Sequence, residues 1–315
     1  MNICLRIALV CVLFRPCFGD ETAPTVQPQE LLSAFELNNE SLERYDVLVK
    51  FTETRINGHD AVSEKKYRQR IRSDLLNDRV LNVALGLKKN DDEEAQPFGF
   101  CLIADGKEIR QSLNLYEKRL LPKRPPSSLK YCFLTQSIPE FRNVGLSDFP
   151  AAFKYHLPDG WRKDFLVYKS NANVKVTPKS ATRVEVSYFF YNEIPVRYKL
   201  TFDLTRNLVV HRELHQMFRS KKSPDIVKFI FMFQESIQWK EVNGVYVPTA
   251  LYFTKSAPSL TGVPDSEEQE VHLTWLSVNE EFDQGDFDVA LADSYEQLQT
   301  LVADPSEKGS DQLPQ

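Results

Sequence analysis

The chain lacks the sequence motifs that mark familiar catalytic sites. It has no Gly-x-Ser-x-Gly nucleophile turn, no glycine-rich phosphate loop and no closely spaced cysteine pair for zinc, and only 11 of its 315 residues are glycine. Carboxylate pairs such as Glu280-Glu281 stand in charged, loop-like stretches, where carboxylates are normally solvated. We therefore expect a protein that is not an enzyme and that needs no cofactor.

Cysteine is scarce beyond the first 19 residues. Of the five cysteines, Cys4, Cys11 and Cys17 lie in that segment, and only Cys101 and Cys132 follow it. An even pair of cysteines in an exported protein favours a disulfide. Both residues also lie in apolar, strand-like runs, where two separate buried thiols are an equally good interpretation. A bridge requires a Cα separation that the sequence does not determine, so both alternatives stay open.

Hydrophobic runs long enough to cross a bilayer are absent as well. The run Ile7–Phe14 is far shorter than the roughly 20 residues that a spanning helix needs. Arg6 precedes this run, and Cys17-Phe18-Gly19 ends it with small residues at both outer positions, which is the layout of a secretory signal. We predict a signal peptide over residues 1–19 with cleavage after Gly19, and a mature chain that is periplasmic or secreted and not an integral membrane protein.

The charge balance is mildly acidic. The formal net charge of −5 becomes −7 when Arg6 and Arg15 leave with the signal. A general nucleic-acid binder shows a clustered basic excess instead, so we expect no nucleic-acid partner. No linker rich in Pro, Gly or Ser divides residues 20–303, which favours a single domain. The tail, residues 304–315, is rich in Ser, Gln, Pro and charge and is predicted to be disordered.

What the chain has in abundance is alternation with a period of two. Between Ile194 and Asp203 apolar and polar residues alternate, which is typical of a strand with one buried and one wet face. Hairpin turns are predicted at Asn57-Gly58, Asp105-Gly106 and Asn243-Gly244. The fold class is therefore mainly β (α+β): a strongly curved antiparallel sheet or half-barrel of about ten to twelve strands.

Helices are few in this interpretation, and we expect them on the concave side of the sheet. One amphipathic helix is predicted between the signal and Tyr45, and a second short helix is predicted from Asp293 to Val302. The segment Ile138–His156 breaks the strand rhythm and contains several prolines, so short helices or a lid-like insertion are expected there.

The sharpest local motif is His211-Arg212-Glu213-Leu214-His215. On a strand, His211, Glu213 and His215 share one face, and next-but-one neighbours lie roughly 6.5–7 Å apart. Two imidazoles and a carboxylate are metal ligands when another element completes the site. The spacing differs from the helical zinc-protease motif, and a solvated polar patch is the alternative interpretation.

A second stripe is cationic. Lys66, Arg68, Arg70 and Arg72 alternate with Tyr67, Gln69 and Ile71, so four cations share one strand face. They are suited to an anionic lipid surface or an acidic partner. The same pattern is also typical of a strand that keeps its outer face wet.

Aromatic residues form the candidate ligand-binding set. The run Val227–Phe233 is apolar on both faces, with Phe229, Phe231 and Phe233 predicted to lie together on one of them. A strand buried on both faces is covered by a helix or lines a cavity. The predicted ligand-binding residues are Tyr198, Phe202, Phe229, Phe231 and Phe233. Core packing is the alternative explanation.

Taken together, three segments carry a resemblance to a known superfamily. They are Leu42-Glu43-Arg44-Tyr45-Asp46-Val47 after the first helix, Trp239-Lys240-Glu241-Val242-Asn243-Gly244-Val245-Tyr246-Val247-Pro248, and Leu273-Thr274-Trp275-Leu276-Ser277-Val278-Asn279. The layout resembles the lipoprotein-carrier (LolA/LolB-like) superfamily, and more closely exported proteins of planctomycete-type bacteria. The resemblance implies a half-barrel with an apolar cleft that receives lipid or the acyl chains of a lipoprotein. An envelope interaction or scaffold module without a small-molecule ligand is the alternative function.

Overall fold

The computed structural model describes residues 28–57, 60–90, 94, 96–112, 141, 144, 174–190, 196–219, 227–257, 265–292 and 295–303. The predicted signal, Cys132, most of the Ile138–His156 segment and the predicted tail lie outside these residues. Within the described ranges, no helix is both long and apolar enough to span a membrane.

Strands dominate the described part of the chain. The strands are β1 (Arg44–Asn57), β2 (Asp60–Asp74), β3 (Arg79–Asn90), β4 (Gln96–Ala104), β5 (Ile109–Ser112), β6 (Lys175–Ser180), β7 (Arg183–Phe190), β8 (Val196–Asp203), β9 (Leu208–Arg219), β10 (Val227–Val242), β11 (Val245–Ala257) and β12 (Asp265–Val278). The helices are α2 (Pro28–Glu40) and α4 (Tyr295–Val302), with 3-10 turns η5 (Gln284–Phe287) and η6 (Val289–Ala292) between β12 and α4.

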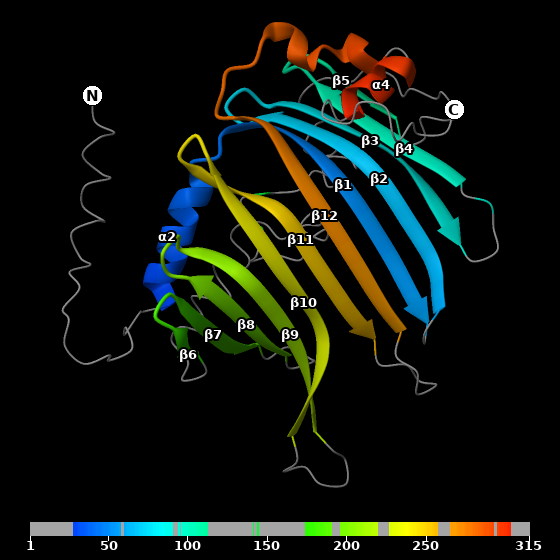
Figure 1. Ribbon diagram of the computed structural model, residues 1–315. Coiled ribbons are helices and arrows are strands. Elements are labelled where there is room, and N and C mark those ends of the chain that lie inside the picture. Colours follow the sequence, from blue (N-terminus) through cyan, green and yellow to red (C-terminus); the bar gives the residue numbers. More distant parts are fainter. Residues whose placement is uncertain are drawn as a thin grey trace, which may run out of the picture.

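These twelve strands of the described chain belong to one antiparallel sheet, with the order β5-β4-β3-β2-β1-β12-β11-β10-β9-β8-β7-β6. Each neighbouring pair is consecutive in strand number except β1 and β12, so two meanders meet at the centre of the sheet. Figure 1 shows the strands as one continuous, strongly bent surface whose edges are β5 and β6. The prediction of a curved antiparallel sheet or half-barrel is confirmed.

Turn chemistry explains why the meanders form where they do. Asn243 and Gly244 both have positive φ, at 52° and 77°, as a two-residue turn requires when its twist matches the flanking strands. Gly106 has φ 87° between β4 and β5, and β1 ends at Asn57 before β2 returns. The three predicted hairpins therefore connect β1 to β2, β4 to β5 and β10 to β11.

One face of the sheet, which we call the concave face, holds the main apolar cluster. This cluster includes residues from β2, such as Ile71, across the sheet to Val184 on β7, together with Leu31 and Phe35 of α2. Phe35 packs edge-on against Trp239 with ring centroids 6.4 Å apart. Asn38 of α2 donates to the Tyr246 carbonyl at 3.1 Å and accepts from the Tyr246 N–H at 2.9 Å, which fixes the helix on β11.

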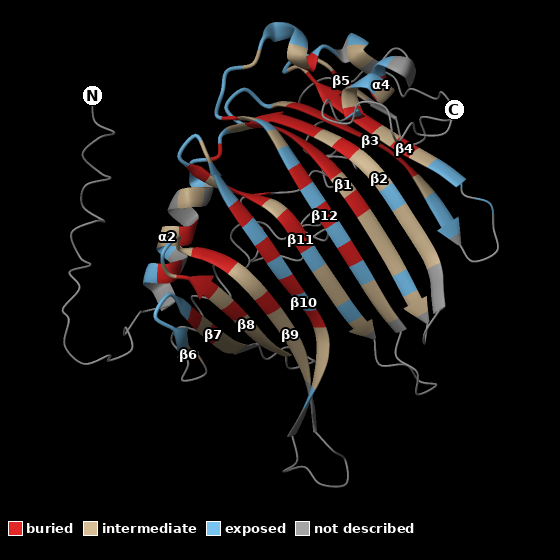
Figure 2. Ribbon diagram, in the orientation of Figure 1, coloured by how far each residue is buried: buried red, intermediate tan, exposed pale blue. Residues whose placement is uncertain are grey.

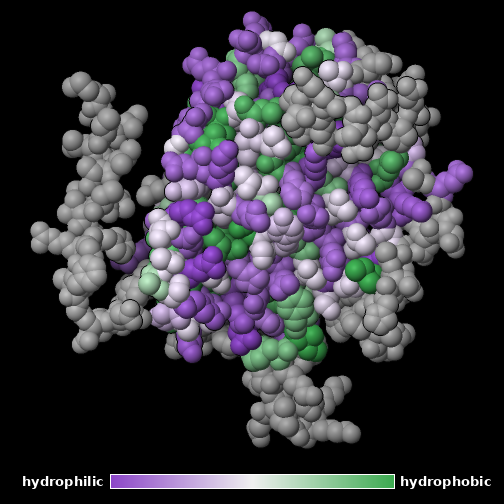
Figure 3. Space-filling model, in the orientation of Figure 1, coloured by the Kyte–Doolittle hydropathy of each residue, from purple (hydrophilic) through white to green (hydrophobic). Residues whose placement is uncertain are grey.

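The opposite face, which we call the outer face, is mostly polar in the part of the chain that the structure describes. Buried and exposed residues alternate along much of β10 and β12 (Figure 2), and the surface turned toward the viewer in Figure 3 is mainly hydrophilic. A second apolar cluster interrupts this face, where Phe287 of η5 and Leu298 and Val302 of α4 cover β3 and β4. Their partners on these two strands are Leu81, Val83, Leu85, Cys101 and Ile103.

The position of the C-terminal helix differs from the one that we expected. We expected the helices on the concave side, and α2 does lie there, but α4 covers the outer face of β2 and β3. The reason is electrostatic as well as apolar. Arg72 on β2 donates to the Asp286 backbone carbonyl and carboxylate, both at 2.7 Å, and Arg70 donates to the Leu301 carbonyl at 3.3 Å. The two arginines hold η5 and α4 on the outer face.

Two irregularities change which side chains share a face. The register of β9 shifts at Val210, because Thr201 pairs with His211 whereas Phe202 pairs with Val209. The register of β10 shifts at Met232, because Phe231 pairs with His215 whereas Phe233 pairs with Leu214. One extra residue in a strand moves every later side chain to the other face relative to a regular strand.

Candidate functional site

The concave face has two ends that differ in their packing. At the end near α2, Tyr45 and Trp275 pack against Phe141 with ring centroids 5.4 and 5.2 Å away, and Phe141 and Val144 are buried. At the other end, aromatic rings from both meanders line the face and several are only half-buried. The half-buried rings are those of Tyr67, Phe98, Tyr188, Tyr198 and Phe253.

These half-buried rings form contacts within each meander. Tyr67 stacks on Phe51 with centroids 4.5 Å apart and meets Phe98 edge-on at 5.8 Å. Tyr188 stacks on Tyr198 at 5.2 Å. Gly86 stands opposite Tyr67 in the register, and a Cβ atom at this glycine would clash with the Lys66 carbonyl and the Tyr67 Cβ. The glycine therefore permits the close approach of β2 and β3 here.

A cation lies over this aromatic group. The Lys65 ammonium is 5.2 Å from the Tyr67 ring centroid and 5.0 Å from that of Phe98. Burial lowers the pKa of Lys65, Glu53 opposes this shift, and Lys88 and Arg55 add to it. The aromatic end of the concave face thus combines apolar surface with one partly desolvated positive charge.

A buried ion pair lies on the same face, and sequence reasoning missed it. Arg212 and Glu235 are 1% and 0% exposed, and the Arg212 Nη2 atom lies 3.2 Å from the Glu235 Oε2 atom. The Arg212 guanidinium also lies 4.8 Å from the Phe233 ring centroid. The available signal was the strand alternation itself, since a charged residue between His211 and Glu213 must face the opposite side.

The predicted ligand-binding residues do not all lie together. Phe202 and Phe233 are buried on the concave face, where Tyr198 is half-buried. Phe229 and Phe231 lie on the outer face, because the bulge at Met232 separates them from Phe233. The expectation that the three phenylalanines of β10 share one face is therefore wrong. Ligand binding by any of the five residues stays a prediction.

The outer face of β8 and β9 carries a charged network. Glu213 accepts from Lys199 at 2.8 Å, and its other carboxylate oxygen lies 3.3 Å from His211 Nε2. His215 Nε2 is 3.7 Å from Glu213. Burial alone would raise the pKa of Glu213, but the hydrogen bond and charge of Lys199, with His211, hold it below its usual value. The bulge at Val210 places Val209 on the concave face instead.

This network argues against the metal-site interpretation. The Lys199 ammonium occupies the carboxylate that a metal would need, and the positive charges of Lys199 and Arg197 near His215 oppose a further cation. Among the residues that the structure describes, no group of three or more His, Cys, Asp or Glu side chains is arranged to hold a metal ion. The arrangement is that of a charged patch in which the Glu213 carboxylate interacts with Lys199 and with two histidines.

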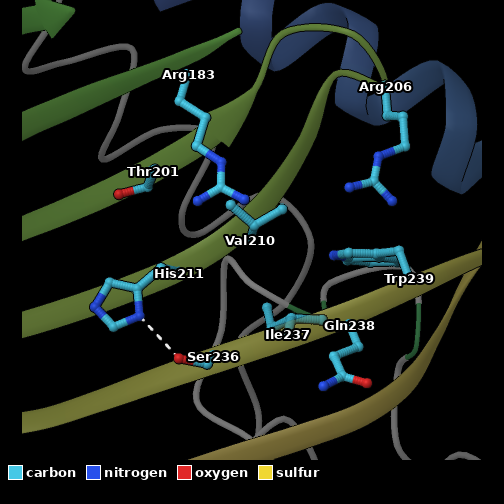
Figure 4. Close-up of a pocket in the computed structure, with 9 residues that line it drawn as sticks. All are labelled: Arg183, Thr201, Arg206, Val210, His211, Ser236, Ile237, Gln238 and Trp239. Carbon is cyan, nitrogen blue, oxygen red and sulfur yellow. Dashed lines mark hydrogen bonds between the residues drawn. The ribbon is translucent and has the colours of Figure 1, made fainter. Parts of the chain in front are cut away.

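A pocket opens on the outer face where two strands part. The β9–β10 ladder ends at the pair His211 and Ser236, although β10 continues to Val242. The Trp239 indole closes part of this gap by donating to the Val209 carbonyl at 2.8 Å. The resulting pocket, which we call the seam pocket, has a volume of about 570 Å³ (Figure 4). It is lined by Arg183, Thr201, Arg206, Val210, His211, Ser236, Ile237, Gln238 and Trp239.

Three of the four cations of the stripe on β2 form ion pairs within the protein. Arg70 and Arg72 both bind the Asp46 carboxylate, at 2.8 Å for each Nη2 atom, and Arg72 also pairs with Asp286. Lys66 pairs with Glu64 at 2.8 Å. The stripe is therefore not a uniform row of cations facing solvent, since its two C-terminal members anchor η5 and α4.

Of the two cysteines in the predicted disulfide, the structure describes Cys101. Cys101 is fully buried in the cluster under α4, which fits either alternative. Cys132 lies outside the described residues. The bridge therefore stays a prediction.

Comparison with known proteins gives only distant structural likeness. No family model matches the chain, and no curated protein matches it. A DUF1329 family protein from Desulfovibrio piger is similar over 84% of this chain and 98% of its own, with 7% identity and a TM-score of 0.37. MucB in complex with MucA(peri) is similar over 79% and 94%, with 9% identity and a TM-score of 0.22.

A second MucA/MucB complex, from Pseudomonas aeruginosa, is similar over 78% of this chain and 93% of its own, again with 9% identity and a TM-score of 0.22. Likeness at this level carries no argument about function. Membership of the lipoprotein-carrier superfamily accordingly stays a prediction.

Proposed function

We propose that the chain is an exported, non-enzymatic binding protein that holds an acyl chain or similar apolar ligand against the aromatic end of its concave face. The observation that carries the proposal is the difference between the two ends of this face. The α2 end is packed with buried side chains, whereas Tyr67, Phe98 and Phe253 at the other end are only half-buried. Burying apolar surface contributes roughly 25 cal/mol per Å², so such rings favour a ligand rich in CH₂ groups.

Lys65 supports an anionic end on this ligand. Its ammonium lies over Tyr67 and Phe98, and its pKa is lowered by burial, which the nearby Glu53 offsets only in part, so a further anion would stabilise the charged form. A fatty acid carboxylate, or the phosphate of a lipid, would supply that anion. The partner is then a lipid or an acylated protein, and the export signal over residues 1–19 would bring the chain to the compartment where such molecules are exchanged.

The test is displacement of a fluorescent fatty acid from the purified mature protein. We expect saturable binding that Phe253→Asp weakens by about tenfold or more, because a charge then opposes burial of the chain. Tyr252→Asp is the matched control, since Tyr252 is the adjacent residue on the outer face and is exposed. Equal binding by both variants, or no binding by the wild type, would end the proposal.

A second comparison tests the role of Lys65. Lys65→Met should weaken a fatty acid by about tenfold but leave the fatty alcohol of equal length nearly unchanged, because only the acid carries a charge. An equal loss for both ligands would assign Lys65 to packing alone.

The alternative function, an envelope interaction or scaffold module, depended on the cationic stripe of β2. Arg70 and Arg72 are occupied by Asp46 and by the C-terminal elements, so charge reversal there would disturb the fold before it reported on a partner. The apolar-ligand role is therefore the one that we propose.

A further inference from the structure

The seam pocket carries an uncompensated positive charge. Its lining includes the cationic side chains Arg183 and Arg206 together with His211, and no carboxylate of the described residues lines it. In Figure 4 the Arg183 side chain, at the start of β7, extends toward Val210, and the Arg206 side chain, in the turn between β8 and β9, extends toward Trp239. A pocket of this size is within the range of small-molecule sites, roughly 300–1,000 Å³.

The nearest carboxylates are already engaged. Asp203 stands opposite Arg183 in the register, but one of its oxygens accepts from Thr205 and the other accepts from Arg206 at 2.9 and 2.6 Å. Glu213 is bound by Lys199, and Glu185 pairs with Lys179 at 2.8 Å. These pairs cancel locally, which leaves the Arg183 guanidinium as the unbalanced charge at the pocket.

Neutral donors surround the same space. The Ser236 hydroxyl shares a hydrogen bond of 3.0 Å with His211 Nδ1, and the side chains of Thr201 and Gln238 line the pocket beside it. The Trp239 ring and Val210 supply an apolar wall. A planar guanidinium presents two parallel N–H groups, which match the two oxygens of a carboxylate or phosphate.

We propose that the seam pocket binds a small organic oxyanion, a carboxylate or a phosphate, with Arg183 as its principal ligand. This site lies on the outer face, so it is separate from the acyl-binding end of the concave face. Ser236 and Gln238 complete the hydrogen bonds to the anion, and Trp239 gives the pocket its fixed wall.

Isothermal titration calorimetry of the mature protein with inorganic phosphate and with citrate, at low salt, tests the site. We expect saturable binding of at least one of the two, weakened by added salt because the site is open to solvent. Arg183→Gln should weaken it by about tenfold or more, and Arg183→Lys should restore part of the loss, since lysine keeps the charge without the fork. Binding of phosphate alone would assign the site to phosphates, and binding of citrate alone would assign it to carboxylates.

The control is Lys175→Gln, which removes the same charge from an exposed position on β6, away from the pocket. Thermal melts of every variant check that the fold is kept. The proposal is overturned by a lack of saturable binding for both anions, by unchanged binding in Arg183→Gln, or by an equal loss in Lys175→Gln.

Discussion

The two faces of β8, β9 and β10 use charge in opposite ways. On the concave face, Arg212 and Glu235 form one ion pair with almost no exposure. On the outer face, Lys199, His211 and Glu213 form a network that remains partly exposed. Breaking a buried pair leaves a charge without solvent, whereas water replaces a lost partner at the surface. Substitution of a charged residue on these strands should therefore lower the free energy of unfolding strongly on the concave face and only slightly on the outer face.

The largest effect is expected from breaking the buried pair. Arg212→Met leaves the Glu235 carboxylate buried without its cation, which should lower the free energy of unfolding by about 3–5 kcal/mol. Urea denaturation followed by circular dichroism measures the change. The double variant Arg212→Met/Glu235→Leu is the control, and it should recover most of the loss. A single variant as stable as wild type would contradict the role of the pair.

The next effect separates the two phenylalanines that the bulge at Met232 places on opposite faces. Phe233 is 5% exposed and Phe229 is 36% exposed. Phe233→Ala should cost about 3–5 kcal/mol through lost packing, and Phe229→Ala only about 1 kcal/mol, mainly the cation–π contact that places the Arg197 guanidinium 4.0 Å from the Phe229 ring. Equal costs would show that β10 is regular instead of bulged.

A smaller effect is expected at the seam. Trp239→Phe removes the hydrogen bond that the indole donates to the Val209 carbonyl at a buried position, at a cost of about 1–3 kcal/mol. Trp275→Phe is the matched comparison, because its indole bonds the Pro248 carbonyl at a half-buried position that water reaches more readily. Chemical denaturation should rank Trp239→Phe as the more costly. The reverse order would contradict the conclusion that the Trp239 hydrogen bond stabilises the region where β9 and β10 part.

The smallest effect is a pH dependence on the outer face. Burial, then Lys199 and Arg197, lowers the pKa of His215 below its usual 6.5. The unfolded chain therefore takes up a proton first as pH falls, and the stability contributed by neutral His215 is present above about pH 6.5 and is lost as pH drops toward the folded pKa. His215→Gln should flatten this loss in denaturation curves between about pH 7.5 and 5. The control His272→Gln keeps His215 and should keep the slope.

Local sequence signals predicted most of the sheet. Alternation located β8, and Asn243-Gly244 fixed the β10–β11 hairpin, because positive φ at both positions leaves few other structures. The first helix was also placed correctly, on the concave side. These features depend on residues close in sequence, which is why a single chain is enough to predict them.

Features that depend on distant contacts were missed. The bulges at Val210 and Met232 have no glycine or proline to mark them, so Phe231 and Phe233 were placed on one face. The outer position of α4 depends on Arg70 and Arg72, which reach across from β2. The seam pocket arises where β9 and β10 stop pairing, and no local pattern marks that point.

The most direct test of the account uses a fatty acid that carries a photoreactive diazirine on its chain. After irradiation of the mature protein, peptide mass spectrometry locates the adducts. We predict adducts on β2, β4 and β11 at Tyr67, Phe98 and Phe253, reduced by unlabelled fatty acid. Adducts confined to exposed outer-face residues such as Leu276, or adducts that competitor does not reduce, would contradict a ligand site on the concave face.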